Sequence, residues 1–192
     1  MNYRVIYIIL FVCLPTIWAQ KLKALPNNEI IIYKIIKNPA TQQDSLVYIG
    51  KSKAEIIQGL GQPEIDRNDD NNGDDLGYVE MALGYIDNNP ETYDVLMIDP
   101  NKDGSPNPYV ISKKYKLGIG RSIPKELLNS VEYRLNTQVS TKPLTPTEEA
   151  ALPQATWKQY SFQIALSDGT PSDGHLAITV QDGKIIKIYI GY

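Results

Sequence analysis

The sequence predicts an α+β fold, an antiparallel β-sheet with two short helices, built from a duplicated strand-helix-strands unit. Apolar and polar residues alternate along most of the chain, which is typical of half-buried strands. Helical periodicity is confined to two short segments, near 52–60 and 122–131. The tetrapeptide pattern Ile-Gly-basic-Ser occurs at the start of both segments, and this repeat predicts the duplication.

The strand pattern is clearest near the C-terminus. Apolar residues at alternate positions form three runs, Tyr160, Phe162, Ile164 and Leu166, then Leu176, Ile178 and Val180, then Ile186, Ile188 and Ile190. Asp182-Gly183, between the last two runs, is typical of a type I′ hairpin turn. We therefore expect an antiparallel meander here. Earlier strand candidates cover 29–37, 45–49, 76–86, 93–98 and 109–117.

A Thr- and Pro-rich stretch, residues 136–156, separates the second helix from the meander and is expected to be an ordered loop or linker. We divide the chain into a signal peptide (1–19), a first helix-plus-sheet unit (20–108) and a second (109–192). The alternative is one compact domain that contains both units.

The first nineteen residues have the features of a secretory signal peptide. Arg4 is followed by the apolar run VIYIILFVCL, which is too short to span a bilayer, and then by Pro15 and the small residue Ala19. Cleavage after Ala19 would place the protein in the periplasm or outside the cell. The alternative is a lipoprotein anchored through Cys13, although Val12 stands where that processing needs a small residue.

Composition excludes several classes of function. Cys13 is the only cysteine, so the exported chain has no disulfide and depends on a buried core. The chain has 19 basic and 22 acidic residues with no basic stripe, which argues against nucleic-acid binding. No later apolar segment approaches membrane-spanning length, so we expect no membrane span.

The stretch YIGKSKAEIIQGLGQP, residues 48–63, contains Gly-Lys-Ser and resembles the end of a phosphate-binding P-loop. A P-loop needs a glycine five positions before its Gly-Lys, where this chain has Ser45. The intervening residues LVYI are typical of a strand, so the backbone cannot curl around a phosphate. We expect no nucleotide site.

A structural interpretation accounts for the same residues. Ser52 is suited to the N-cap of a helix, and Glu55, three positions later, completes a capping box. Gly50 lets the strand turn, Gly61 stands where a C-cap glycine belongs, and Pro63 prevents continuation of the helix.

The segment IGKSKAEIIQGLGQP resembles the SmpA/OmlA outer-membrane lipoproteins and the β-lactamase-inhibitor-protein-like domains, and IGRS at 119–122 resembles the start of a second copy. The second copy lacks the Gly-x-Pro exit. The resemblance implies a tandem helix-then-antiparallel-sheet module of the bacterial envelope that works in binding or assembly without catalysis. It assigns no functional residue, because the matched positions belong to the scaffold.

The sequence DPNKDG, residues 99–104, matches the first half of an EF-hand-type calcium loop. Asp99, Asn101 and Asp103 would supply oxygen ligands. The twelfth position is Val110, where a bidentate Glu would complete the shell, so the alternative is an Asx-rich hairpin loop. No cofactor other than Ca²⁺ is indicated.

Residues 64–77 form a strongly acidic stretch, predicted to be an exposed and mobile loop because no apolar residue lies between Ile65 and Leu76. Either a metal or a basic patch on a protein partner could organise it. Its acidic residues are Glu64, Asp66, Asp69, Asp70, Asp74 and Asp75.

The chain is not expected to be an enzyme. His175, the only histidine, lies beside Ser172 and Asp173, but three residues of one hairpin cannot align as nucleophile, base and orienting group. The sequence contains no HExxH, GxSxG or His/Cys metal cluster.

Tyrosine outnumbers phenylalanine thirteen to two, and tyrosine is enriched in recognition surfaces. The aromatic candidates for a sheet-face interface are Tyr78, Tyr85, Tyr93, Tyr160 and Trp157. As partner-binding residues we predict Asp66, Asp69, Asp70, Asp74, Asp75, Tyr78, Tyr85 and Trp157.

These observations predict an exported, non-catalytic protein-binding module. Its partner would be an envelope protein in assembly, an inhibited enzyme, or a periplasmic toxin that the chain neutralises as an immunity protein. The alternative is a calcium-dependent surface or adhesion module that uses the Asp99–Asp103 loop.

Overall fold

The computed structural model describes residues 21–39, 43–69, 73–78, 81–85, 93–100, 107–140 and 155–192. The predicted signal peptide, with Cys13, lies outside these residues, and so do most of the Thr- and Pro-rich stretch and the greater part of the predicted calcium loop.

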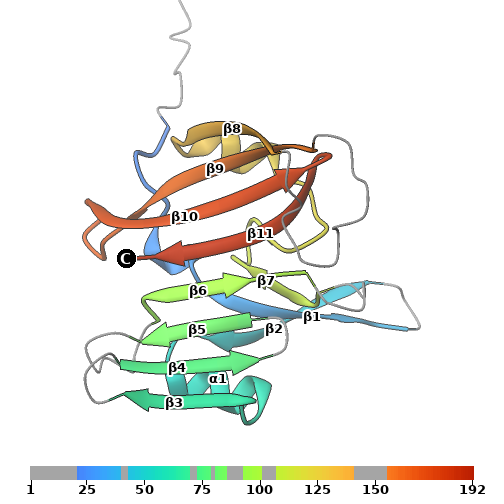
Figure 1. The fold of residues 1–192 in the computed structure, drawn as a ribbon, viewed down its shortest axis with the longest axis vertical. Coiled ribbons are helices and arrows are strands. Elements are labelled where there is room, and N and C mark those ends of the chain that lie inside the picture. The colour runs from blue at the N-terminus through green and yellow to red at the C-terminus, as the bar shows by residue number, and fades with distance from the viewer. Residues whose placement is uncertain are drawn as a thin grey trace, which may run out of the picture.

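Eight strands form one large antiparallel sheet (Figure 1). Their order across it is β3-β4-β5-β6-β11-β10-β9-β8. The strands are β3 (Ile65–Asp69), β4 (Gly73–Tyr78), β5 (Met81–Tyr85), β6 (Val95–Ile98), β8 (Arg134–Ser140), β9 (Ala155–Ala165), β10 (Pro171–Gln181) and β11 (Lys184–Gly191).

Two short α-helices precede the two halves of this sheet. Helix α1 (Lys53–Leu60) is followed by β3–β6, the first meander, and α2 (Lys125–Ser130) is followed by β8–β11, the second meander. The last strands of the two meanders, β6 and β11, pair with each other at the centre. The prediction of an α+β fold with mostly antiparallel sheet and two short helices is confirmed.

A second, three-stranded sheet has the order β2-β1-β7. Its strands are β1 (Ile32–Lys37), β2 (Asp44–Gly50) and β7 (Tyr109–Ile111), and the short 3-10 helix η1 (Asn27–Glu29) precedes them. β7 opens the predicted second unit at residue 109, yet it pairs with β1 of the predicted first unit.

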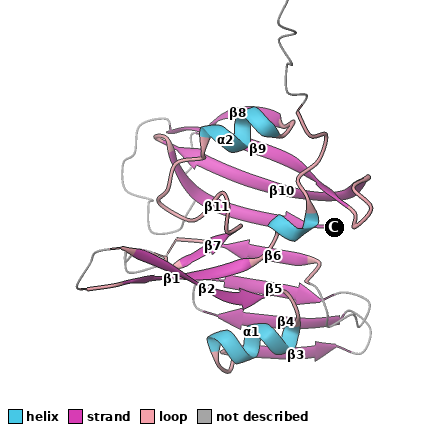
Figure 2. Cartoon of the chain, turned by 180° about the vertical axis from the view of Figure 1, so that it is seen from behind, coloured by secondary structure: helices cyan, strands magenta, loops and turns pink. Residues whose placement is uncertain are grey.

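One face of the large sheet is covered. Figure 2 shows both α-helices in front of the sheet when the molecule is viewed from behind. The core on this side joins Ile56 of α1 and Leu127 of α2 to apolar residues of both sheets. The completely buried side chains that the large sheet contributes are Leu96, Ile98, Phe162, Ile164, Leu176, Ile178, Ile185, Ile188 and Ile190. Burial of one such side chain stabilises the fold by about 1.5–3 kcal/mol.

The opposite face of the large sheet, which we call the open face, carries no helix or strand among the described elements (Figure 1). The strand register assigns its residues, because directly paired residues point to the same side. One row crosses all eight strands and consists of Ile65, Gly77, Ala82, Met97, Tyr189, Ala177, Ser161 and Arg134.

Several predicted boundaries were wrong. The acidic stretch 64–77, predicted to be a mobile loop, forms the β3–β4 hairpin, and the strand predicted over 76–86 is divided between β4 and β5. β8 extends to Ser140, into the predicted linker. Hydrogen bonding to neighbouring strands overrides the weak strand propensity of these polar residues.

The C-terminal meander is present, with Asp182 and Gly183 at φ 49° and 75° as a type I′ turn requires. A register shift beside Val180 brings Ile185 into the core, in place of the predicted Ile186. Leu166 lies beyond the end of β9 and is exposed.

The predicted helix cap is confirmed. The Ser52 hydroxyl accepts a hydrogen bond from the Glu55 N–H, the Glu55 carboxylate accepts one from the Ser52 N–H, and Gly61 ends the helix at φ 87°. The second Ile-Gly-basic-Ser segment behaves differently, because Ser122 precedes α2 without capping it. Pro124 stands at that N-cap and no side chain caps the helix.

Candidate binding face

The open face differs between the two meanders. On β3–β6 the described side chains of this face are small or apolar, with Asp75 at the margin. On β8–β11 they are mostly neutral and polar, with a histidine, a tyrosine, a tryptophan and the cations Arg134, Lys184 and Lys187. Each half contains a hollow, and we call these the apolar hollow and the polar hollow.

The apolar hollow has a volume of about 430 Å³. Glycines keep its floor low: a Cβ added at Gly77 would lie 3.0 Å from the Cβ of Ile65, and one at Gly84 would lie 3.3 Å from a carboxylate oxygen of Asp75. Its lining residues are Ile65, Asp75, Leu76, Gly77, Ala82, Leu83, Gly84, Tyr85, Val95 and Met97. This hollow is suited to an apolar side chain of a partner.

The predicted acidic contacts are divided between the two sides of the β3–β4 hairpin. Asp75 is exposed and borders the apolar hollow. Asp66 points to the other side, where its carboxylate lies 3.2 Å from the Lys53 ammonium on α1. Asp69 and Asp74 lie in the paired strands, but their side chains are outside the described set, and Asp70 is outside the described residues altogether.

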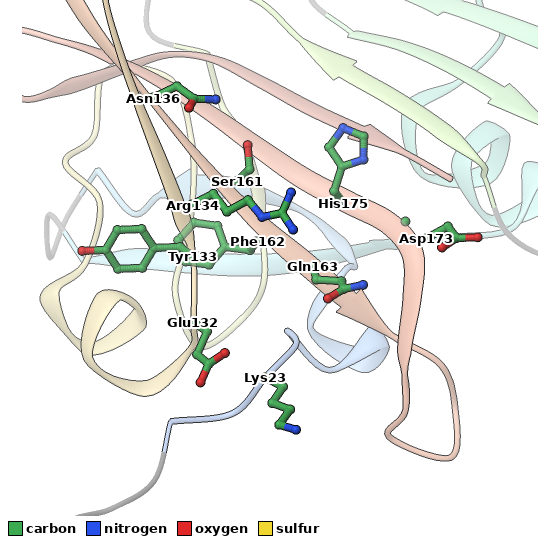
Figure 3. Close-up of a pocket in the computed structure, with 11 residues that line it drawn as sticks. Lys23, Glu132, Tyr133, Arg134, Asn136, Ser161, Phe162, Gln163, Asp173 and His175 are labelled. Atoms are coloured by element: carbon green, nitrogen blue, oxygen red, sulfur yellow. The ribbon is translucent and has the colours of Figure 1, made fainter.

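The polar hollow, at the other end of the sheet, has a volume of about 510 Å³ (Figure 3). Its lining combines two basic side chains, two carboxylates, amides and an imidazole. The residues are Lys23, Glu132, Tyr133, Arg134, Asn136, Ser161, Phe162, Gln163, Asp173, Gly174 and His175. Such a mixed set can form hydrogen bonds with a peptide or a polar side chain.

The Ser172, Asp173 and His175 cluster lies at the margin of the polar hollow. The Ser172 hydroxyl donates a hydrogen bond of 2.7 Å to the Ile164 carbonyl. Its proton is therefore directed at the backbone and not at an imidazole. The His175 ring packs beside Tyr189, with centroids 5.9 Å apart. The cluster lies in β10 where the pairing with β9 shifts its register, between Pro171 and His175.

Two predicted aromatic contacts, Tyr78 and Tyr85, point to the covered side. Tyr85 is 1% exposed, and its hydroxyl donates to the Lys51 carbonyl at 3.2 Å. Tyr78 donates to the Gly61 carbonyl at 3.1 Å. They face the core and bind the backbone that flanks α1, so neither lies on the open face, and their part in partner binding stays a prediction.

Among the other aromatic candidates, Tyr93 is buried and its hydroxyl donates to the Ile30 carbonyl at 3.1 Å. Tyr160 lies on the covered side beside Tyr133, with ring centroids 5.5 Å apart. Trp157 belongs to the open face, paired with Gln181, and is half-buried. Its indole nitrogen is buried and has no hydrogen-bond partner in the part of the chain that the structure describes. Trp157 is thus the predicted aromatic contact that a partner on the open face can reach.

Of the predicted calcium ligands only Asp99 is described, while Asn101 and Asp103 are not. The Asp99 carboxylate lies 3.7 Å from the Lys187 ammonium, and its carbonyl accepts a hydrogen bond from Asn107. Within the described ranges no three His, Cys, Asp or Glu residues form a metal-binding group. Calcium binding stays a prediction.

Lys51, the lysine of the Gly-Lys-Ser motif, serves the scaffold. Its ammonium donates to the Asn27 backbone carbonyl and, at 2.7 Å, to the Asn27 side-chain oxygen, which ties η1 to the start of α1. Burial lowers the pKa of Lys51 to about 8. Hydrogen bonds from the Lys51 and Ser52 N–H groups lower the pKa of Glu55 to about 2.

Sequence reasoning missed both hollows. The sequence did contain a signal for the apolar hollow. At the positions that alternate with buried residues in β4 and β5 it has the small residues Gly77, Ala82 and Gly84. For the polar hollow we find no such local signal, because its residues come from 23, 132–136, 161–163 and 173–175.

The described residues thus define an α+β protein whose large antiparallel sheet has one covered and one open face. None of its described helices is long and apolar enough to cross a membrane. Comparison of the chain with protein-family models, curated proteins and solved structures gives no match. The resemblance to SmpA/OmlA-like and β-lactamase-inhibitor-protein-like domains therefore stays a prediction.

Proposed function

We propose that this chain is an exported, non-catalytic protein-binding module of the bacterial envelope that contacts its partner through the open face. The observation that carries the proposal is the apolar hollow, which exposes the apolar side chains Ile65, Val95 and Met97 on a face that no described helix or strand covers. An apolar depression with a polar margin is typical of a protein-interaction site.

The form of the partner surface follows from the chemistry of this half of the face. An apolar side chain would fill the hollow, and basic residues beside it would face Asp75. A central apolar contact with charges at the rim is the arrangement in which a few residues supply most of the binding energy. Assembly factors, inhibited enzymes and periplasmic toxins are the three kinds of partner that the proposal includes.

The proposal also includes a tandem origin. It is supported by the order of elements, because each α-helix is followed by four antiparallel strands and the two sets run in mirrored order across the sheet. The segments Ile49–Ser52 and Ile119–Ser122 precede α1 and α2 in corresponding places. The two copies would have diverged on the open face.

Site-specific photocrosslinking tests the proposed contact. A photoreactive amino acid at Ala82, in the apolar hollow, should capture a discrete envelope protein that mass spectrometry can identify. The matched control places the same group at Lys113, an exposed residue beyond β7 and away from the open face. Equal capture from both positions, or none from Ala82, would contradict the proposed contact.

A substitution that fills the apolar hollow provides a second test of the proposed contact. Gly84→Leu should fill the hollow and reduce recovery of the partner captured through Ala82, whereas Lys113→Leu should leave recovery unchanged. Because the atoms nearest to a Cβ at Gly84 belong to the side chains of Asp75 and Val95, at 3.3 Å or more, we expect the variant to fold, which circular dichroism checks. Unchanged recovery with a folded Gly84→Leu variant would exclude the apolar hollow as the contact.

A further inference from the structure

The β1–β2 hairpin extends away from the large sheet (Figures 1 and 2). β7 pairs with β1 only over Ile32–Lys34, while β2 pairs with β1 along its whole length. Beyond Lys34 the hairpin is therefore two-stranded. We call Tyr33–Lys37 with Asp44–Tyr48, which also includes the two pairs beside β7, the ribbon. A two-stranded ribbon is marginally stable by itself.

The ribbon carries apolar side chains on both faces. Ile36 and Val47 point to one face and are 48% and 42% exposed, while Tyr48 points to the other and is 51% exposed. Ile35 and Leu46 form a pair on the same face as Tyr48 and are half-buried. Three of the nine exposed large apolar side chains in the described chain lie in this ribbon, so exposed apolar side chains are concentrated there.

The outer edge of β2 is also unprotected. Within the described part of the chain no strand pairs with that edge, so its outward N–H and C=O groups can bind another strand. Natural edges are usually guarded by Lys, Pro or charged residues. Edge strands β3 and β8 carry charged residues such as Asp66 and Arg134, and β7 has only three residues. β2 has the sequence DSLVYIG, and its one charge, Asp44, is paired with Arg121 at 3.3 Å.

We propose that the edge of β2 pairs antiparallel with the same edge of a second copy of this chain. Ile49 and Gly50 are buried and lead into α1, so the exposed stretch Asp44–Tyr48 is the part that can pair. Its midpoint is Leu46. Two-fold symmetry then places Leu46 opposite Leu46 of the second copy, Ser45 opposite Val47, and Asp44 opposite Tyr48.

This register matches side chains across the two copies. On one face Ile35 and Leu46 meet their counterparts and form an apolar row across four strands. The rows on either side place Lys37 and Asp44 next to Tyr48 and Tyr33 of the second copy. A partner of identical sequence thus places Leu46 beside Leu46 and extends the apolar row on this face.

The charges permit this pairing. The two Asp44 residues stand four positions apart along the joined strands, a separation of about 13 Å at the strand rise of about 3.3 Å per residue. That distance exceeds the Debye length of about 8 Å at physiological ionic strength. No like charges lie directly opposite each other in the paired stretch.

Disulfide trapping tests the proposal, because Cys13 is the only cysteine in the sequence. In a Cys13→Ala background, Leu46→Cys places two thiols opposite each other at Cα separations of about 4.5–5.5 Å, within the range that a disulfide spans. We expect about tenfold more disulfide-linked dimer than from the matched control Ile65→Cys, because pairing raises the local thiol concentration. Ile65 has the same 48% exposure as Ile36 but lies on β3.

Sedimentation of the chain without introduced cysteines gives an independent readout. We expect a dimer that Leu46→Lys converts to a monomer, since it places two ammonium groups directly opposite each other, while Ile65→Lys leaves the dimer intact. If Leu46→Lys fails to fold, the trapping experiment still decides. A monomer at every concentration, or trapping of Leu46→Cys no greater than that of Ile65→Cys, would overturn the proposal and leave the edge to a strand of another protein.

Discussion

The first and second meanders have the same order of elements but expose different surfaces. Each follows a short helix, contributes four antiparallel strands and buries apolar residues on the covered side. On the open face the row that crosses the sheet has Gly77, Ala82 and Met97 on β4, β5 and β6, and Ser161, Ala177 and Tyr189 on the mirrored strands β9, β10 and β11.

The difference shows which positions the fold constrains. Covered positions must fill space between the sheet and the helices, so most of them are apolar in both meanders, and Asp66, at the edge strand β3, pairs with Lys53 of α1. Open positions carry no such requirement and are available for recognition. The N-termini of the helices differ as well, since α1 has a complete capping box and α2 has no side-chain cap. The following predictions test how strongly the two meanders are joined and how far their helix N-termini differ.

The largest change in the free energy of unfolding is expected where the two meanders meet, at the pairing of β6 with β11. Leu96 on β6 is fully buried and pairs with Ile190 on β11. Leu96→Ala should destabilise the chain by about 2–5 kcal/mol, because it removes buried methyl groups and leaves a cavity. Trp157, the only tryptophan after residue 19, lies in the second meander and reports its unfolding in urea by fluorescence.

If the two meanders unfold together, the Trp157 transition shifts although Leu96 belongs to the first meander. Val95→Ala, on the open face, is the matched control and should cost about 1 kcal/mol or less. A normal Trp157 transition alongside an early loss of circular dichroism would show that the meanders unfold separately.

The next largest effect is the dependence of stability on pH that Lys51 causes. Its folded pKa of about 8 lies below the ordinary 10.5, so between these values the unfolded chain holds a proton that the folded chain has lost. Stability should therefore rise with pH from 8 to 10.5, by about 1–2 kcal/mol after allowance for partial exposure. Raised tyrosine pKa values act in the opposite direction near pH 10, so the comparison uses the difference between variants.

Lys51→Met should remove this rise, whereas Arg121→Met, at the corresponding place in the second segment, should retain it. Urea midpoints measured across this pH range provide the test. A slope that is unchanged in Lys51→Met would show that Lys51 has an ordinary pKa in the folded chain.

Replacing the serine by alanine should reduce stability by different amounts in the two segments with the pattern Ile-Gly-basic-Ser. Ser52→Ala should cost about 1 kcal/mol, because the Glu55 N–H loses its acceptor at the start of α1. Ser122→Ala should change stability by about 0.5 kcal/mol at most, since Ser122 is exposed and does not cap α2. Equal costs measured by thermal unfolding would contradict the difference between the two helix N-termini.

The smallest effect concerns calcium. A weak site at Asp99, Asn101 and Asp103, with a dissociation constant of about 1 mM, would stabilise the chain by about 0.4 kcal/mol at about 1 mM Ca²⁺. Calorimetry in Ca²⁺ and in Mg²⁺, with Asp99→Asn as the control, measures it. Identical melting curves under all these conditions would remove the calcium-dependent alternative.

Local interactions explain most of what could be predicted. The capping box at Ser52, the Asp182-Gly183 turn and the alternation in β9–β11 each depend on residues a few positions apart, and the structure confirms them. The β3–β4 hairpin was not predicted, because β4 is held by pairing with β5 and the polar sequence of the hairpin gives no local signal of that pairing. The face to which Tyr85 belongs could not be predicted, because period-two alternation identifies two faces without saying which one is covered.

The sequence by itself determined the short helices, the hairpin turn and the strand alternation, since these depend on backbone preferences and contacts between near neighbours. Only the tertiary structure decided that α1 and α2 cover the same face, that β6 pairs with β11, and that no described strand pairs with the outer edge of β2. The physical reason is that these features depend on contacts between residues distant in the sequence, and those contacts exist only once the sheet has formed.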